Sequence, residues 1–408
     1  MTVVLKFGGT SVGSIERLRN VARRVASTAS EGEQIAVVVS AMGKTTDELL
    51  SLAREINPRP PRRETDLLMV TGEMVSSALL TMALVDLGCP AVALTGAQAG
   101  VFTDDSFGRA RIRGIDTWRV EEEFAQGHVV VVAGFQGQSP QGDYATLGRG
   151  GSDTSAVALG AALRASRVEI YTDVQGIYTT DPRIEPNARC LRDIASEEML
   201  EAAQQGAGVM HPRAVELGLL YDIPILVASS QAEFGSGGGT MIRREVQMEP
   251  ENRVRTIALD RDVASVTLRH VPDRPGIAAQ VFGPLADAGI SVDTIVQNAS
   301  ELQLTDLTFT VSQTDWEETR EISRPLADDL GAADVLFKHD LVKVSLIGTG
   351  MQSGPGYAAT MFRSLSQAGI NIELITTSEI RITCLVNADR GEEAVRVLHA
   401  AFELDQEA

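Results

Sequence analysis

Thr146-Leu147-Gly148-Arg149-Gly150-Gly151-Ser152-Asp153-Thr154-Ser155 joins an apolar strand pattern to an Ala-rich helix pattern. Its three glycines let backbone N–H groups approach a ligand closely, and residues 152–155 are of types that cap helix N-termini. Arg149 adds a cationic fork that suits a carboxylate or a phosphate. The stretch therefore predicts an anion-binding turn at a helix start, although an exposed glycine loop before a helix has the same pattern.

On both sides of this stretch, short apolar runs alternate with helical patterns. Strand patterns occur at 3–7, 35–40, 91–95, 129–135 and 168–173. A polar hairpin is predicted over 136–144, one long apolar helix over 64–87, and a helix from about 154 to 163. Apolar strands without strict alternation indicate a mainly parallel sheet covered on both faces. We therefore expect a three-layer α/β/α domain over residues 1–235.

Ligands of such sheets collect beyond the carboxyl ends of the strands. Gly8-Gly9, Ser40, residues 148–152 and Thr172-Asp173 all follow predicted strands. We expect these separate turns to form one site.

Length, composition and charge limit the function classes. At usual domain sizes, 408 residues predict two to four domains, and 44% hydrophobic with 22% charged residues is typical of soluble globular proteins. The net charge of −19 argues against general binding to nucleic acid or to acidic membranes, because no basic excess is present to release counterions. We expect neither nucleic acid nor a membrane among the partners.

The N-terminal apolar run is only three residues long and lacks a basic leader, and no uncharged apolar run approaches the roughly 18 residues that cross a bilayer. A cytoplasmic location is therefore expected. Cys89, Cys190 and Cys384 are odd in number and far apart, which disfavours a disulfide framework or a zinc site. All three are expected to be buried thiols.

The C-terminal half contains an internal duplication after a glycine-rich tract, which with the following charged residues predicts a linker over 236–254. Residues 275–290 return as 355–370 at a constant offset of 80 residues. Each copy has the pattern strand, Pro-Gly helix start, helix, Gly stop and strand, which predicts two small α/β modules over 255–333 and 334–408.

The helix starts of the two copies offer unpaired N–H groups to an anion. Asp273 and Arg274 precede the first Pro-Gly, whereas Ser353 and Gly354 precede the second. Only the first copy thus has charges suited to a zwitterionic ligand, although the duplicates could serve dimerisation alone.

Two common nucleotide motifs are absent. Gly43-Lys44-Thr45 matches the end of a P-loop, but Val38 stands where that motif needs glycine, and Asp153 stands where a dinucleotide motif needs its third glycine. Polar residues at the loop positions nevertheless suit phosphoryl transfer, which needs cations and backbone donors around the phosphates. Lys6 lies close to the two glycines Gly8 and Gly9 and could supply such a cation. Glu73 is a carboxylate within an apolar helix pattern, which suggests a functional role, although a solvent-facing helix position is the alternative interpretation.

Several longer motifs resemble the signature segments of bacterial aspartokinases, in that family's order. They are Lys6 to Val12, Ser40 to Leu49, Thr71 to Glu73, Gly134 to Gly137, Thr146 to Thr154, Tyr171 to Asp173 and Tyr178 to Arg183. The duplicated half is similar to the paired ferredoxin-like ACT domains of the same enzymes. The resemblance implies an amino-acid-kinase fold for the N-terminal half and covers nearly the whole chain.

The resemblance implies transfer of the γ-phosphoryl group of MgATP to the side-chain carboxylate of L-aspartate. The product would be 4-phospho-L-aspartate, at the start of lysine, threonine and methionine biosynthesis, with ATP and Mg²⁺ required and the metal carried by ATP. The residues implied in transfer are Lys6, which stabilises the phosphoryl group, and Asp153, which organises the cations. Those implied for aspartate are Thr45, Glu73, Arg149 and Ser152. Those implied for the nucleotide are Gly8, Gly9, Ser40, Thr172, Asp173, Tyr178 and Arg183.

Regulation by lysine, threonine or both is implied for the ACT half, together with a homodimer or a small regulatory subunit that could start at Met248. The effector candidates are Asp273, Arg274, Gly276, Ile277, Ala278, Asp293, Gln297, Asn371 and Ile372. Alternatives are another amino-acid or carbamate kinase on the same fold, or a sensor that has lost activity.

Gly208 replaces a basic residue found in many members of the family, and Gln175 replaces a usual Asp, which puts their nucleotide or metal roles in doubt. His211 is expected to begin or pack a helix and not to act as a base.

Overall fold

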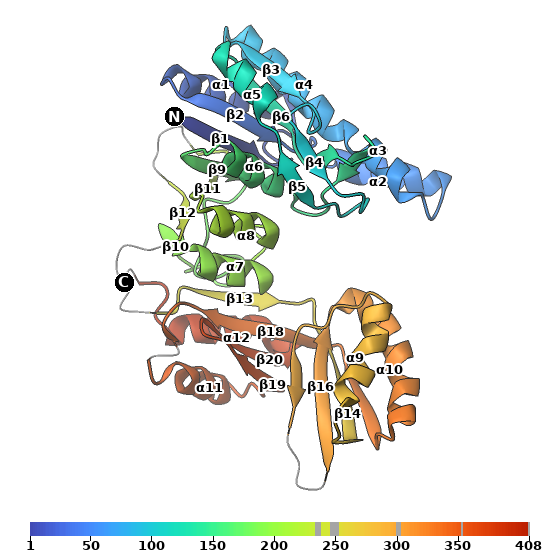
Figure 1. Ribbon diagram of the computed structural model, residues 1–408. Helices are drawn as coiled ribbons and strands as arrows, with labels where there is room; N and C mark the ends of the chain where they lie inside the picture. Colours follow the sequence, from blue (N-terminus) through green and yellow to red (C-terminus); the bar gives the residue numbers. More distant parts are fainter. Residues whose placement is uncertain (233–237, 245–252, 299–302, 352–353, 407–408) are drawn as a thin grey trace. The chain divides into compact units, whose positions relative to one another are not determined.

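The computed structural model describes residues 1–232, 238–244, 253–298, 303–351 and 354–406 (Figure 1). They form two compact units, which are described separately. The first contains the described residues of 1–178, 190–204 and 208–249, and the second contains 179–189, 205–207 and the described residues from 250 to 408.

The first unit is organised around an eight-stranded sheet in the order β10-β12-β11-β9-β1-β2-β6-β3. Its strands are β1 (Thr2–Phe7), β2 (Gln34–Val39), β3 (Ala91–Leu94), β6 (Val129–Ala133), β9 (Arg167–Thr172), β10 (Asp193–Ala195), β11 (Ile225–Ser229) and β12 (Thr240–Arg243). All neighbours are parallel except β11 and β12, so the predicted mainly parallel sheet is confirmed.

Strand β12 corrects the predicted linker over 236–254. Its residues pair with β11 and β10 within the sheet, because alternating buried positions at Thr240 and Ile242 give them a place in the core. Residues 236–237 and 245–252 of that linker, including Met248, lie outside the described residues.

Side-chain alternation along β1 separates the core from the site. Leu5 and Phe7 pack with α1 (Ile15–Ser30) and α4 (Thr71–Asp86) on one face of the sheet. Lys6 points to the opposite face, where α6 (Gly151–Ala162) lies against β1 and β9 (Figure 1). A period of two residues thus places one buried cation beneath α6.

The remaining helices of this unit are α2 (Thr45–Ile56), α3 (Arg62–Met69), α5 (Trp118–Ala125), α7 (Ser196–Gln204) and α8 (Pro212–Tyr221). The prediction of one helix over 64–87 was wrong in detail, because α3 and α4 meet at Val70. By length and composition residues 62–86 are apolar enough to span a membrane, a test that core helices of soluble proteins also pass. Asp66 and Glu73, both buried, lie within this segment.

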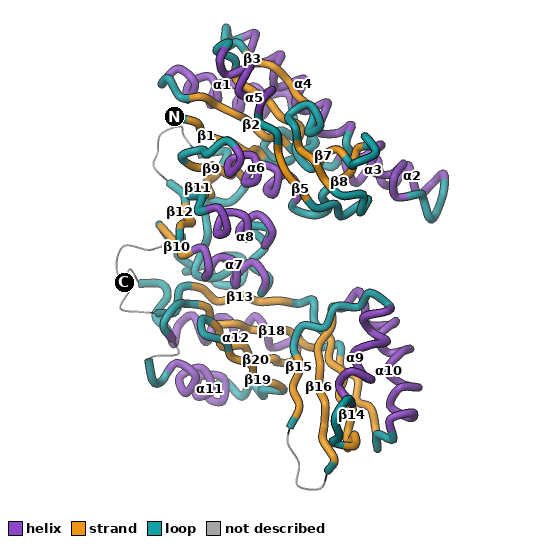
Figure 2. Tube along the Cα trace, viewed as in Figure 1, coloured by secondary structure: helices purple, strands orange, loops and turns teal. Residues whose placement is uncertain are grey.

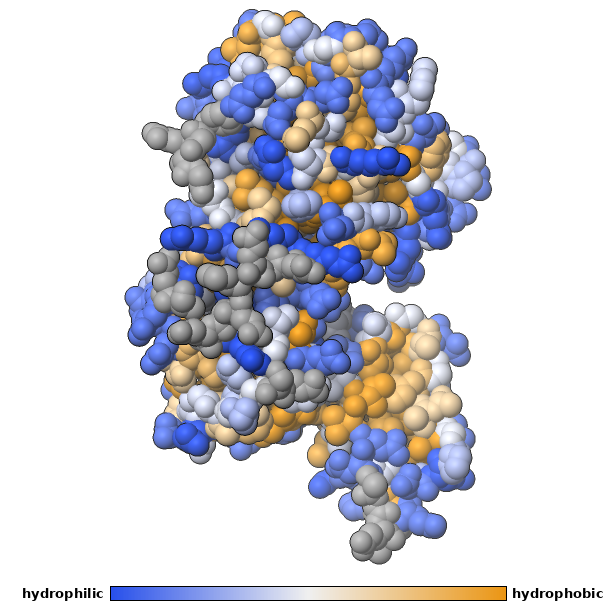
Figure 3. All heavy atoms as spheres, turned by 60° about the vertical axis from the view of Figure 1, so that its left-hand side comes forward, coloured by the Kyte–Doolittle hydropathy of each residue, from blue (hydrophilic) through white to orange (hydrophobic). Residues whose placement is uncertain are grey.

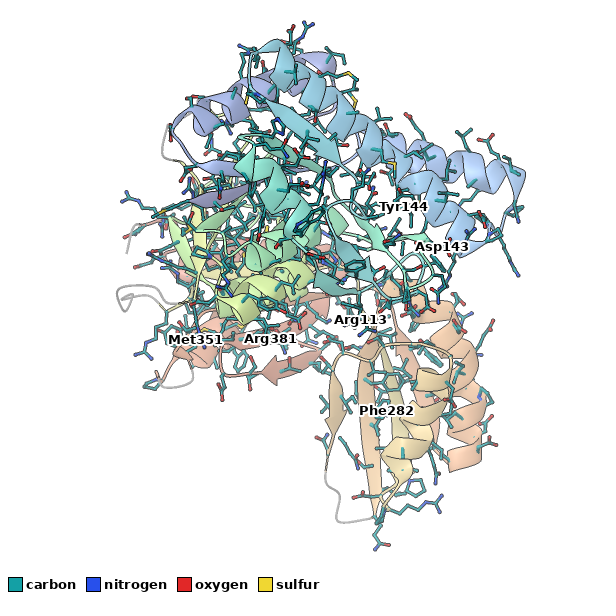
Figure 4. All side chains as sticks on the ribbon, turned by 45° about the horizontal axis from the view of Figure 1, so that its top comes forward. Arg113, Asp143, Tyr144, Phe282, Met351 and Arg381 are labelled. Atoms are coloured by element: carbon teal, nitrogen blue, oxygen red, sulfur yellow. The ribbon has the colours of Figure 1, made fainter. Side chains whose placement is uncertain are left out.

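A smaller sheet in the order β5-β4-β7-β8 joins the same unit. It contains β4 (Val101–Thr103), β5 (Ile112–Ile115), β7 (Gln136–Gln138) and β8 (Tyr144–Thr146). The predicted hairpin is confirmed, because β7 and β8 pair antiparallel with Gln136 opposite Thr146. Asp143, labelled beside Tyr144 in Figure 4, forms a 2.5 Å ion pair with Arg63 of α3. This ion pair connects the hairpin, which leads into the glycine-rich stretch, to α3.

The second unit holds two four-stranded sheets with the orders β15-β16-β14-β17 and β13-β18-β20-β19 (Figure 2). Their strands are β13 (Thr256–Asp260), β14 (Ala264–Pro272), β15 (Ile295–Gln297), β16 (Leu304–Val311), β17 (Asp334–Lys338), β18 (Leu341–Ile347), β19 (Leu374–Thr377) and β20 (Arg381–Asn387). The helices are α9 (Ile277–Asp287), α10 (Trp316–Leu330), α11 (Tyr357–Gln367) and α12 (Gly391–Ala401), with short 3-10 turns at Gln313–Asp315 and Ala388–Arg390.

The duplication is visible in the two helix starts. Gly276 and Gly356, 80 residues apart, precede α9 and α11 with φ of 93° and 113°, which favours glycine. One pairing crosses the predicted division of the modules: β13 lies within 255–333 but pairs antiparallel with β18 of the other sheet. The exact domain limits stay a prediction.

The first module leaves apolar side chains exposed on its strands, and Figure 3 shows such residues gathered over this part of the chain. Ile295, Leu304 and Leu336 are among them. On the helix side Phe282, labelled in Figure 4, packs edge-to-face on Phe309 with ring centroids 5.4 Å apart.

The three cysteines are free thiols that differ in burial. Cys384 is buried as predicted, whereas Cys89 and Cys190 are only half-buried. Cys89 follows the end of α4, where a helix terminus reaches the surface, and Cys190 lies in a connecting segment. The expectation of three buried thiols was therefore wrong for two of them.

Candidate active site

The carboxyl ends of four neighbouring strands meet at one edge of the large sheet. Phe7 of β1 is opposite both Val39 of β2 and Tyr171 of β9, and Val39 is in turn opposite Ala133 of β6. The turns that follow are therefore adjacent, as predicted. Glycine is needed there, since a Cβ on Gly9 would lie 2.8 Å from the carbonyl oxygen of Ala41.

Lys6 and Asp153 form the electrostatic centre of this edge. Lys6 Nζ lies 2.5 Å from Asp153 Oδ1, and both side chains are largely buried. Asp153 is in the first turn of α6, where the helix dipole stabilises a negative charge. Because burial strengthens the attraction between the two charges, the ammonium group is held in one place.

Two hydroxyl groups lie next to this ion pair. Ser40 follows β2 and Ser152 precedes Asp153, and their Oγ atoms are 2.8 Å apart. The approach depends on Gly134 after β6, because a Cβ there would lie 2.9 Å from Ser152 Cβ. The contact therefore joins the end of the sheet to the start of α6.

Glu73 is a buried carboxylate with only one of its oxygens in use. Its Oε1 accepts a 3.1 Å hydrogen bond from the Ala41 N–H, next to Ser40, while Oε2 has no partner among the described residues. The side chain is 3% exposed, so the solvent-facing alternative was wrong. Burial raises the pKa of Glu73 to about 7, against the hydrogen bond from Ala41, which lowers it.

Asp66 is a second buried carboxylate, which sequence reasoning missed. It accepts three hydrogen bonds: from Gly108 N–H at 2.9 Å, Thr146 N–H at 2.7 Å and Thr146 Oγ1 at 2.8 Å. It therefore ties α3 to the first residue of the glycine-rich stretch. The signal was present, because Asp66 precedes Glu73 by seven residues, a spacing that places two residues on one helical face.

The glycine-rich stretch differs in detail from its prediction. Helix α6 begins at Gly151 with Gly150 as its N-cap, whereas residues 152–155 were predicted to cap it near 154. The reason is that Gly148 and Gly150 adopt φ of 77° and 64° and turn the chain earlier. The N–H groups of residues 152 and 153 therefore belong to the first turn, where they lack intrahelical acceptors.

Helix α8 holds this turn from the other side. A Cβ on Gly150 would lie 2.2 Å from atoms of the His211 side chain, so only glycine fits beneath it. His211 Nδ1 accepts a 3.3 Å hydrogen bond from the Arg213 N–H as the N-cap of α8, which confirms the predicted helix start. Arg213 donates to the carbonyls of Leu147 at 2.6 Å and Ala110 at 3.1 Å. Burial lowers the pKa of His211.

Two other residues predicted to hold aspartate are Arg149 and Thr45. Arg149 is exposed and forms no ion pair with any residue that the structure describes. Thr45 begins α2, and its hydroxyl donates a 2.7 Å hydrogen bond to the Met42 carbonyl. Their roles stay predictions.

The other predicted nucleotide residues, besides Gly8, Gly9 and Ser40, lie at the end of β9 and in the segment that follows it. Thr172 Oγ1 donates to Asp173 Oδ1 at 3.1 Å, at the carboxyl edge of the sheet. Tyr178 donates to Gln175 Oε1 at 3.3 Å, so Gln175 has a local structural partner. Arg183 belongs to the second unit, where it pairs with Asp181 at 2.7 Å.

The predicted effector residues all lie in the second unit. Gln297 Nε2 is 3.4 Å from Asp273 Oδ1, which joins β15 to the turn before α9. Asp293 pairs with Lys343 at 2.5 Å. Ile277 is buried in the core of the first module, and Ile372 packs against that of the second. The others are at exposed positions: Arg274, Gly276, Ala278 and Asn371.

Comparison with known proteins matches residues 1–229 to the amino acid kinase family, and residues 266–324 and 344–402 to ACT domains. The chain is 47% identical over 406 residues to an aspartokinase of Thermus thermophilus, covering 99% of both chains. It is 30% identical to E. coli aspartokinase III in complex with aspartate and ADP, covering 98% of this chain and 99% of that one with a TM-score of 0.80. The E. coli enzyme in complex with lysine and aspartate also matches, with 30% identity, the same coverage and a TM-score of 0.74.

Proposed function

The chain belongs to the aspartokinase family, and we propose that it phosphorylates L-aspartate at the cluster formed by Lys6, Asp153, Ser40, Ser152 and Glu73. The γ-phosphoryl group of ATP passes to the side-chain carboxylate and gives 4-phospho-L-aspartate, the first step towards lysine, threonine and methionine. One observation carries the site assignment: Glu73 has a buried carboxylate oxygen without a partner among the described residues, and its other oxygen binds the residue after Ser40. Ser40 in turn contacts Ser152, which precedes the Asp153 that holds the Lys6 ammonium group.

Glu73 is suited to bind the ammonium group of aspartate. Its Oε2 can accept the hydrogen bond that the described residues leave unmade, and a charge-assisted bond there would return the carboxyl group to its ionised form. Arg149 is free to meet a carboxylate of the same substrate through its guanidinium fork, with Thr45 and Ser152 as hydroxyl partners.

The transfer step needs charge neutralisation more than a base. The acceptor carboxylate is already an anion at neutral pH, so its oxygen attacks the γ-phosphorus, the bond from that phosphorus to the bridging oxygen breaks, and ADP leaves. Lys6 offsets the negative charge of the transferring group, and Asp153 holds the ammonium in position. Binding both anions beside one fixed cation supplies proximity and orientation.

The nucleotide enters as MgATP, whose Mg²⁺ arrives with the phosphates as part of the substrate. The backbone N–H groups of Gly9 and of the first turn of α6 are donors suited to phosphate oxygens. The Gly8 N–H donates a 3.2 Å hydrogen bond to the Tyr171 carbonyl, so Gly8 is proposed to line the phosphates without donating to them. Ser40, Thr172, Asp173, Tyr178 and Arg183 complete the proposed nucleotide set. Gly208 supplies no cation to this nucleotide set. Nucleotide binding should tolerate the missing charge, because an exposed charge contributes little binding energy.

The second unit is proposed to bind lysine, threonine or both. Asp273 beside the start of α9 can meet an ammonium group, and the exposed N–H groups of that helix can meet a carboxylate. The apolar strands of the first module are proposed to pair with a second copy, giving a homodimer in the cytoplasm.

The proposal is tested by incubating the full chain with MgATP, hydroxylamine and one acceptor at a time: aspartate, glutamate or carbamate. Hydroxylamine converts an acyl phosphate into a hydroxamate, so the expected result is aspartyl hydroxamate with stoichiometric ADP. Adding lysine or threonine then measures feedback inhibition. Formation of a hydroxamate from another acid but not from aspartate would refute the substrate assignment.

A further inference from the structure

The chain leaves the first unit within the proposed nucleotide motif. Tyr178 belongs to the first unit, whereas residues 179–189 belong to the second, and the chain returns at Cys190. Arg183 lies inside this excursion. Residues 179–183 of the motif are therefore part of the second unit.

The excursion is paired to strand β13. The Ile257 N–H donates a 2.8 Å hydrogen bond to the Thr179 carbonyl, and Thr180 Oγ1 donates a 2.9 Å hydrogen bond to the Ile257 carbonyl. Thr179 and Thr180 are 1% and 4% exposed. Two neighbouring residues of the motif are thus fixed to both polar groups of one strand residue.

A buried histidine adds a side-chain contact to this pairing. His399 of α12 is 2% exposed, and its Nε2 lies 2.9 Å from Thr179 Oγ1. The same hydroxyl oxygen accepts a 2.9 Å hydrogen bond from the Arg189 N–H at the far end of the excursion. Thr179 therefore joins both ends of the excursion to the C-terminal helix.

The hydroxyl is chemically matched to a neutral imidazole. Burial lowers the pKa of His399, opposed by the charges of Glu185 and Asp405 and aided by that of Arg189. Since Arg189 already donates to the Thr179 oxygen, the hydroxyl hydrogen is left to point at the imidazole nitrogen. An apolar side chain of similar size at position 399 would fill the space but leave the buried Thr179 hydroxyl without its acceptor.

We propose that His399 is a positioning residue for the nucleotide. From helix α12 it fixes Thr179, and through Thr179 it holds the segment from Tyr178 to Arg183 in the conformation that binds ATP. This inference rests on the proposed nucleotide role of that segment. It assigns the second module a direct part in nucleotide affinity, since α12 belongs to the core of that module.

The test uses the full chain with His399→Leu and Thr179→Val. We expect the dissociation constant of ADP, measured by calorimetry, and the KM for ATP to rise about fivefold or more, the effect of one lost buried hydrogen bond. The kcat and the KM for aspartate should stay within about twofold. His399→Gln and Thr179→Ser keep a hydrogen-bonding group and should restore most of the ADP affinity, which a purely structural role would not predict.

Thr383→Val is the matched control. Its hydroxyl is buried in the same unit, 2.7 Å from Ser345 Oγ, and does not contact residues 179–189. ADP affinity should be unchanged in this variant, while its thermal stability falls by an amount similar to that of Thr179→Val. Equal weakening of ADP binding in both Thr→Val variants would overturn the inference, as would wild-type ADP affinity in His399→Leu.

Failure of the proposed function gives a different result. If the wild type binds ADP but makes no aspartyl hydroxamate, the activity assignment fails, while the ADP binding of the His399 variants still decides the positioning role. If the wild type phosphorylates aspartate and His399→Leu binds ADP normally, only the positioning role fails.

Discussion

Asp66 and Glu73 lie seven positions apart on adjoining helices and are both buried, at 1% and 3% exposure, yet their oxygens are used differently. Asp66 accepts three hydrogen bonds, from Gly108 and twice from Thr146. Glu73 accepts one, from Ala41, and leaves Oε2 without a partner among the described residues. Burial raises the pKa of both carboxyl groups.

The difference separates a carboxylate that stabilises the fold from one suited to a ligand. A buried charge with a complete set of donors is compensated within the protein, whereas a buried oxygen without a donor destabilises the folded state. Asp66 therefore fixes the first residue of the glycine-rich stretch. Glu73 has an oxygen that can bind a cationic group of a ligand. Substitution of Asp66 is therefore predicted to affect stability, and substitution of Glu73 to affect binding.

The largest effect is expected for Asp66→Ala. The substitution leaves two backbone N–H groups and one hydroxyl without their acceptor, so the free energy of unfolding should fall by about 3 kcal/mol or more. Urea denaturation measures the change. Thr146→Val removes only one of the three bonds and should lose about a third as much. A loss below about 1 kcal/mol for Asp66→Ala would remove the distinction between the two carboxylates.

Glu73→Gln should affect binding and not stability. Losing the charge should lower kcat/KM for aspartate about 100-fold, because a hydrogen bond to a charged group is worth about 1.5–3 kcal/mol. The free energy of unfolding should be unchanged or higher, since a neutral amide is easier to bury than a carboxylate. Steady-state kinetics and urea denaturation of the same preparation measure both quantities. A variant that loses stability but keeps its KM for aspartate would make Glu73 a second structural carboxylate.

The pH dependence follows from the pKa of Glu73, about 7 in the folded protein. Aspartate keeps its ammonium group in this range, so its dissociation constant should rise about tenfold from pH 8 to pH 6 as Glu73 is protonated. Equilibrium binding avoids the titration of ATP. Since the folded pKa exceeds its ordinary value of 4.5, the stability that Glu73 contributes is present at low pH and lost as pH rises to about 7. Neither trend should remain in Glu73→Gln.

The same contrast explains what the sequence could predict. Strand alternation places Lys6 opposite Leu5 and Phe7, and glycine turns follow the strands, so the convergence at the sheet edge follows from local patterns. The complete shell around Asp66 was not predictable in this way, because its donors Gly108 and Thr146 are 42 and 80 residues away. Their meeting depends on tertiary packing.

Local sequence patterns also could not predict which segments pair with each other in the folded chain. Strand β13 has the length and apolar content expected of a strand, but nothing in its sequence selects β18 of the other sheet as its neighbour. The same holds for residues 179–189, whose place in the second unit depends on contacts with Ile257 and His399. The motif from Tyr178 to Arg183 could be recognised in the sequence, whereas its contacts with Ile257 and His399 could not be predicted.

The smallest effect is expected at Gly208, which is exposed, whereas Asp66 and Glu73 are buried. A Cβ there would meet no atom within 4 Å, so Gly208→Lys can be introduced without a clash. An exposed charge interaction is worth about 0.2–1 kcal/mol, so the KM for ATP should fall no more than about fivefold, and less at high salt. Gly208→Gln controls for side-chain length. A larger gain would show that a solvated charge can match a buried one in effect, and an equal gain with glutamine would show that the gain does not come from the charge.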